Sequence, residues 1–213
     1  RSRSAAVAKE VFGEKPLPGV LVVDRYGGYN KMPSKIQYCY AHLLRDVKEL
    51  EKDFPDNPEI KAFVEALAPQ LANAISLRTF DITDRQFKKQ AAKIKDAIIE
   101  ITNRQAKHPA IWKIQDIFRE KADRLYHWAD DRTVPADNNL AERELRTLVI
   151  ARKISFGSQS ENGAKTREIL MTVLHTLKKR TPDAANAFKS ALDELSEKSD
   201  IDLAKALFNL NSS

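Results

Sequence analysis

The sequence predicts a mainly helical α+β protein, and three observations carry this prediction. Residues 19–24 form one continuous apolar and β-branched run, which is typical of a strand buried on both faces in a parallel sheet. Most of the remaining chain repeats its apolar residues at helical spacing. No strand pattern occurs within residues 55–132. We therefore expect a few parallel strands near the amino terminus and helices elsewhere.

The first 54 residues contain the expected strands. A short helix is predicted over 4–12, and two prolines follow it and break the helical pattern. The apolar run at 19–24 is the first strand, and residues 36–40 are a candidate for the second. Apolar residues at spacings of four and three then predict a helix over 41–53.

Residues 55–132 are predicted to be entirely helical. One helix includes residues 60–67, and Pro69 should kink or end it. Two further apolar stripes run over 87–101 and 111–128. This pattern indicates a helical insertion or subdomain.

The rest of the chain, 133–213, is helical again after a cap-rich turn at 135–139. Its expected helices cover residues 140–149, 169–177, 185–198 and 202–210, with a polar loop at 156–163. The chain is therefore expected to have a first core part (1–54), a helical insertion (55–132), a second core part (133–180) and a helical tail (181–213).

Composition narrows the class of protein. The 213 residues carry 36 Lys and Arg against 30 Asp and Glu, a net charge of +6, which is compatible with an anionic partner. The single cysteine, Cys39, excludes an intramolecular disulfide and a multi-cysteine zinc module. No apolar run approaches the roughly 18 residues of a membrane span. Because the chain opens with Arg1 rather than Met, we expect a piece of a longer protein.

Two carboxylates are candidates for chemistry, and each also has a structural interpretation. Asp24 ends the predicted buried strand, where ligands collect in open parallel sheets, but Asp is also a common turn residue. Glu142 stands near a predicted helix start. It has the spacing of a helix cap and of an ion pair with Arg146, so a structural role is the better explanation from these residues alone.

Other polar residues give weaker signals. Cys39 and His42 are three positions apart, but no second pair completes a zinc site, so a buried cysteine and a hydrogen-bonded histidine are the default. Basic residues surround the loop at 156–163, and their one-sided charge favours contact with phosphate. These residues are Arg143, Arg146, Arg152, Lys153, Lys165 and Arg167.

Four motifs occur in series. They read Val23-Asp24-Arg25-Tyr26-Gly27-Gly28-Tyr29, Cys39-Tyr40-Ala41-His42-Leu43-Leu44-Arg45, Asp137-Asn138-Asn139-Leu140-Ala141-Glu142-Arg143, and Arg152-Lys153 followed by Phe156-Gly157-Ser158. Together they resemble the insertion-sequence-66 family of bacterial transposases. That family carries D-G-Y-x-x-Y, C-x-A-H-x-R-R, D-N-N-x-A-E-R and R-K-x-x-x-F-x-G-S in this order.

The resemblance implies a partial ribonuclease-H-like core and a D-D-E metal site. Asp24 matches the second aspartate and Glu142 the glutamate, so both are expected to be catalytic and to bind Mg²⁺ or Mn²⁺. Carboxylates suit these hard cations, and two ions can stabilise both the entering and the leaving oxygen of phosphodiester attack. The motif residues Cys39, His42, Asn138 and Asn139 have no role that we can derive. The implied partner is DNA, at element ends and target, in the bacterial cytoplasm near the nucleoid, with a homo-oligomer possible and no membrane.

Two departures from the family pattern matter. Arg25 stands where the family commonly has Gly. The first aspartate belongs on a strand upstream of the helix at 4–12, so the first three strands and that carboxylate are expected to lie outside this sequence. We therefore expect residues 1–213 by themselves to be inactive. Strand 19–24 should then pair with another chain, or the sheet should have only two short strands.

Alternative functions stay open at this point. The chain could be a non-catalytic nucleic-acid-binding helical protein or a degenerate transposase remnant, which would not need Asp24 beside Glu142. A helical interaction module, for which the charge is incidental, is a third reading. The D-D-E assignment predicts that the two carboxylates lie within roughly 4–8 Å of each other.

Overall fold

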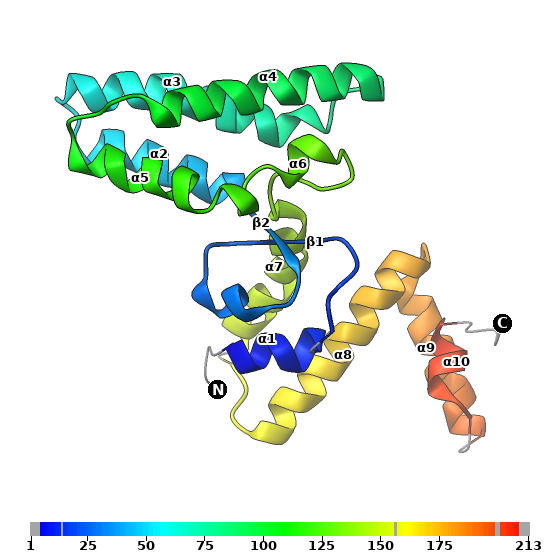
Figure 1. Cartoon of the computed structure of the whole chain (residues 1–213). Coiled ribbons are helices and arrows are strands. Elements are labelled where there is room, and N and C mark those ends of the chain that lie inside the picture. The colour runs from blue at the N-terminus through cyan, green and yellow to red at the C-terminus, as the bar shows by residue number, and fades with distance from the viewer. Residues whose placement is uncertain (1–4, 14, 156, 199–200, 209–213) are drawn as a thin grey trace. The chain divides into compact units, whose positions relative to one another are not determined.

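The computed structural model describes residues 5–13, 15–155, 157–198 and 201–208. Contacts divide the chain into two compact units, residues 1–142 and 143–213 (Figure 1). Two short 3₁₀ helices, η1 (Gly27–Lys31) and η2 (Ala122–Arg124), accompany the regular elements. The regular elements are α1 (Ala5–Phe12), β1 (Val20–Val23), β2 (Lys35–Tyr38), α2 (Tyr40–Asp53), α3 (Pro58–Leu77), α4 (Asp84–Asn103), α5 (Pro109–Glu120), α6 (His127–Asp130), α7 (Asn139–Ile154), α8 (Glu161–Arg180), α9 (Ala184–Glu197) and α10 (Leu203–Phe208).

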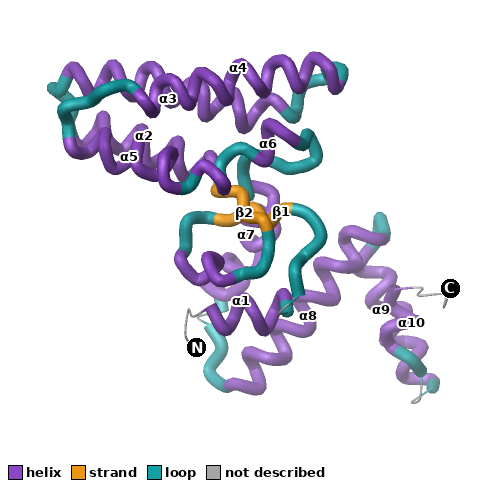
Figure 2. The backbone as a smooth tube through the Cα atoms, in the orientation of Figure 1, coloured by secondary structure: helices purple, strands orange, loops and turns teal. Residues whose placement is uncertain are grey.

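The sheet of the first unit consists of β1 and β2, which pair in parallel from Val20 with Lys35 to Val23 with Tyr38 (Figure 2). The described residues form no other sheet, so the prediction of a mainly helical protein with few parallel strands is confirmed in that part of the chain. The expected strand end at Tyr40 is wrong. Tyr40 begins α2, and its backbone N–H donates to the Ala136 carbonyl at 2.8 Å instead of extending the sheet.

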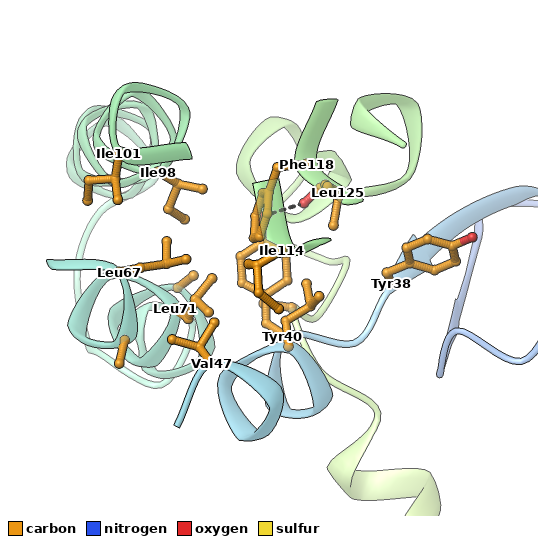
Figure 3. Close-up of a cluster of buried hydrophobic side chains, with 14 of the residues drawn as sticks. Tyr38, Tyr40, Val47, Leu67, Leu71, Ile98, Ile101, Ile114, Phe118 and Leu125 are labelled. Atoms are coloured by element: carbon orange, nitrogen blue, oxygen red, sulfur yellow. Dashed lines mark hydrogen bonds between the residues drawn. The ribbon is translucent and has the colours of Figure 1, made fainter. Parts of the chain in front are cut away.

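Helices α2 to α5 pack into a layer whose interior is the main hydrophobic core (Figure 3). Leu67 and Leu71 of α3 are fully buried there, between α2 and α4. The helix runs through Pro69 to Leu77, so the proline does not end it. Pro69 is exposed, and the one backbone hydrogen bond that it removes leaves a carbonyl on the solvent side. Packing of its buried neighbours therefore outweighs the local cost.

Buried polar contacts attach β2 to the helical layer. The Gln37 side chain is fully buried; it donates to the Leu125 carbonyl at 3.1 Å and accepts from the Trp128 backbone N–H at 3.3 Å. The Tyr40 hydroxyl donates to the same Leu125 carbonyl at 2.7 Å, as the dashed line in Figure 3 shows. Burial holds the pKa of Tyr40 well above its usual value, so the hydroxyl stays a donor. These contacts fix the strand end that carries the next motif.

The second unit contains the rest of α7 together with α8, α9 and α10. The predicted helices are present, although positions 209–210 of the last one lie outside the described residues. Their apolar stripes, however, are mostly exposed: Leu145 is 54% and Ile169 56% accessible. Among the described residues of this unit only Leu177 and Ala191 are buried hydrophobics, so most of each stripe lies outside any core there. No helix in the described ranges is both long and apolar enough to span a membrane.

Candidate active site

Asp24 follows the last residue of β1, at the carboxyl end of the sheet where the sequence placed it. Its Oδ1 accepts a hydrogen bond from the Tyr26 backbone N–H at 3.1 Å, so it also forms the turn that the structural interpretation predicted. A Cβ on Gly28 would collide with the Tyr26 ring, which explains a glycine at this position. The carboxylate is therefore held by its own loop and keeps a second oxygen for other contacts.

Arg25, the departure from the family pattern, has a structural explanation. Its guanidinium forms an ion pair with Asp46 of α2, and both side chains are only partly exposed. Burial lowers the pKa of Arg25 from its usual value. Arg25 therefore anchors the loop after Asp24 to the helix that carries the second motif.

Cys39 joins three segments at the end of the sheet. Its backbone N–H donates to the Val23 carbonyl at 2.8 Å, and its Sγ accepts from the Asn138 N–H at 3.4 Å. The side chain is 1% exposed, and burial raises the pKa of the thiol. A protonated, buried thiol is a poor metal ligand and nucleophile, so the contacts indicate a packing role.

His42 and Glu142 meet although 100 positions separate them. His42 Nε2 lies 3.5 Å from Glu142 Oε1, and the Glu142 backbone N–H donates to the Asn138 carbonyl at 3.1 Å in the first turn of α7. His42 Nδ1 is buried without a hydrogen-bond partner among the described residues. Cys39 is the N-cap of α2 and His42 follows three residues later, so the C-x-x-H spacing directs both side chains to the segment that bears Glu142.

The two asparagines of the third motif behave differently. Asn139 is the first residue of α7, and it donates to Asp137 through its backbone N–H at 3.1 Å and its side-chain Nδ2 at 2.8 Å. It therefore shapes the helix start. Asn138 Oδ1 is buried and has no hydrogen-bond partner in the described part of the chain.

Comparison with known proteins bears on this arrangement. A family model described as "Transposase IS66 family" matches residues 1–166. The chain belongs to the IS66 transposase family. The uncharacterized protein y4jD of Sinorhizobium fredii (strain NBRC 101917 / NGR234) is 25% identical over 193 residues, which cover 83% of this chain and 37% of that protein. The chain thus spans little more than a third of the length of this curated relative. No solved structure matches the chain.

Membership of the IS66 family confirms the resemblance and raises the question of a metal. The donor chemistry of Asp24 and Glu142 fits a hard divalent cation, since both offer carboxylate oxygens. The described residues contain no group of three or more His, Cys, Asp or Glu that could hold a metal ion. The fit is therefore partial: the two side chains are of a kind that suits such an ion, but no group of three potential ligands includes them among the described residues. Their separation of roughly 4–8 Å stays a prediction.

The basic residues that surround the loop at 156–163 lie on α7 and α8. Five of them are exposed: Arg143, Arg146, Arg152, Lys153 and Lys165. Arg167 is half-buried, and its Nη1 has no partner among the described residues. Gly157 follows the end of α7, where its N–H donates to the Arg152 carbonyl at 2.8 Å, and its φ of 87° is a left-handed conformation that favours glycine. Phe156 of the same motif lies outside the described residues.

Proposed function

We propose that the protein to which this chain belongs is a DNA transposase. It would cleave DNA strands at the ends of its mobile element and join them to a target, with Asp24 and Glu142 as two active-site carboxylates. The observation that carries the proposal is the convergence of three IS66 motifs at the carboxyl end of β1. Cys39 contacts both the strand before Asp24 and the turn before α7, and His42 contacts Glu142 itself.

The proposal assigns a place in the fold to each part of the chain. The sheet, α2 and the start of α7 would be the later part of a ribonuclease-H-like core, with its first strands and first aspartate upstream of Arg1. The helices between 55 and 132 would be an insertion that separates the two carboxylates in sequence, and residues 133–180 would complete the core. The tail, 181–213, lies beyond the motifs.

Each side chain then has a definite task. Asp24 and Glu142 would hold Mg²⁺ or Mn²⁺, which when bound helps to activate water or a 3′-hydroxyl and stabilises the charge on the phosphate. His42, in contact with Glu142, would keep that carboxylate oriented toward Asp24. Arg143, Arg146 and the other exposed basic residues of α7 and α8 would contact the phosphate backbone, which provides affinity without reading sequence.

The test uses the longer protein that contains residues 1–213 and DNA bearing the ends of its own element. Wild type should nick these ends in the presence of Mg²⁺ or Mn²⁺. Asp24→Asn and Glu142→Gln should each abolish nicking while leaving DNA affinity within about threefold, because each removes one negative charge and no packing contact. Glu49→Gln and Asp53→Asn, at exposed positions of α2, are matched controls and should remain active.

Two outcomes would contradict the proposal. Nicking that survives Asp24→Asn would place the chemistry elsewhere in the protein. Sequence-independent DNA binding without any metal-dependent nicking by the wild type would favour a non-catalytic nucleic-acid-binding protein. Residues 1–213 by themselves should not nick, since the resemblance places the first aspartate upstream.

A further inference from the structure

Helix α4 carries the densest positive charge of the chain, and it lies outside the four motifs in the sequence. Residues 85–95 contain five Lys and Arg and no Asp or Glu, the highest net charge of any eleven consecutive residues. Four of the five are exposed, and we name them the α4 basic face. They are Arg85, Lys88, Lys89 and Lys93.

The α4 basic face points away from the core. At about 100° per residue its four members fall within an arc of about 140°. Phe87 and Ala91, which are buried, lie on the opposite side of the helix, toward α3. Figure 1 shows α3 and α4 on the side of the helical layer away from β1 and β2. The face is therefore open to a partner that approaches from outside the layer.

No acidic side chain in the described part of the chain forms an ion pair with this face. None of its four members has an ion pair or side-chain hydrogen bond among the described residues, whereas the acid that starts the helix, Asp84, pairs with Arg132 at 3.0 Å. The fifth base of the run, Lys95, pairs with Asp130 at 3.4 Å and lies 5.3 Å from the centre of the Tyr126 ring. The basic residues at the flank of the helix, Lys95 and Arg132, are thus paired with acids, whereas the four of the α4 basic face are unpaired among the described residues.

We propose that the α4 basic face binds the phosphate backbone of duplex DNA, as a second contact surface besides the basic residues of α7 and α8. The inference rests on the proposed function, because that function makes DNA the expected polyanion. From Arg85 to Lys93 the helix rises about 12 Å, which matches the axial length of three to four phosphates of one strand. No exposed large apolar side chain of the described residues lies on α4. The face therefore lacks the aromatic platforms that hold single strands and the apolar side chains that enter membranes.

The experiment measures binding of residues 1–213 to a 30-base-pair duplex of arbitrary sequence by fluorescence anisotropy over a range of salt concentrations. The test variant carries Arg85→Gln, Lys88→Gln, Lys89→Gln and Lys93→Gln. The control carries Lys48→Gln, Lys52→Gln, Lys61→Gln and Lys113→Gln, which remove the same charge from exposed positions on other helices. Glutamine keeps helix propensity close to that of Lys and Arg, and circular dichroism checks the fold of both.

The test variant should bind about tenfold or more weakly, and its plot of log affinity against log salt should be shallower by about 2–4, since each lost phosphate contact contributes about 0.9. The control should change this slope by less than about 1. Equal effects of the two variants, or no effect of either, would overturn the inference, as would absence of binding by the wild type.

A footprint on the wild type tests the same point without any substitution. Duplex DNA should protect Lys88, Lys89 and Lys93 from acetylation, as read by mass spectrometry, and leave Lys48 and Lys113 reactive. Equal protection by polyglutamate would indicate an acidic polypeptide as partner and overturn the assignment to DNA. A negative result in the binding or footprint experiment would not change the outcome of the nicking assay or its dependence on Asp24 and Glu142. The proposal for the α4 basic face can therefore be wrong while the proposed function is right, and the reverse.

Discussion

Removing both side-chain donors of the Leu125 carbonyl should cost more stability than the sum of the two single removals. Gln37 and Tyr40 donate to this one buried acceptor, at 3.1 and 2.7 Å, and both side chains are fully buried. Each single substitution leaves the carbonyl with one of the two donors. The double substitution leaves it with neither, and an unsatisfied buried carbonyl costs about 1–3 kcal/mol.

The magnitudes follow from the bonds lost. Tyr40→Phe removes one hydrogen bond and should lower the free energy of unfolding by about 1 kcal/mol. Gln37→Met removes the bond to Leu125, the bond to the Tyr38 carbonyl and the acceptor of the Trp128 N–H, so we expect about 2–4 kcal/mol. The double variant should lose a further 1–2 kcal/mol, roughly, beyond the sum of the two.

Urea unfolding at neutral pH, followed by tryptophan fluorescence, measures these free energies. Both tryptophans of the chain lie in the first unit, so the signal reports the unit that holds the contacts. Gln115→Met is the matched control, because its buried amide donates to the Arg104 carbonyl at 2.7 Å and shares no partner with Tyr40. The losses in unfolding free energy of Gln115→Met and Tyr40→Phe should add up in their double variant within about 0.5 kcal/mol. Additivity of Gln37→Met with Tyr40→Phe would refute the reasoning.

Three further predictions concern a helix cap, alkaline pH and the site. Asn57→Ala should lower the free energy of unfolding by about 1 kcal/mol in the same urea assay, because its side chain caps two backbone N–H groups of α3, whereas Asn57→Asp should cost little. Burial raises the pKa of Tyr126 from an ordinary value of about 10 to about 12. Between these two pH values the folded state therefore retains a proton that the unfolded state loses. The contribution of Tyr126 to stability is fully present below a pH of about 10 and should be lost as the pH rises to about 12. In urea titrations over this range the free energy of unfolding of Tyr126→Phe should fall less steeply than that of the wild type. The proposed function has His42 orient Glu142, which it contacts at 3.5 Å. In the longer protein His42→Ala should therefore slow single-turnover nicking about 10- to 100-fold at unchanged DNA affinity, with partial recovery in His42→Gln; an unchanged rate would contradict this.

The sequence by itself determined the features that depend on neighbours along the chain. The continuous apolar run predicted β1 as a strand, although only Val23 of its four residues is buried, and the helices follow from apolar residues at a helical period. Asp24 could be placed at the end of β1 because a strand ends where its apolar run ends. The family followed from the order of four motifs, which folding does not alter.

Tertiary structure decided whatever depends on residues far apart. Tyr40 leaves the strand because its N–H meets the carbonyl of Ala136, and α3 continues through Pro69 because buried neighbours hold it. The apolar stripes of α7 and α8 have the right period, yet the period of a helix does not show whether a partner element covers it. The contact of His42 with Glu142 is the clearest case. No local hydrogen bond or side-chain period relates positions 100 residues apart, so only the packing of α2, the sheet and the start of α7 brings the two side chains together.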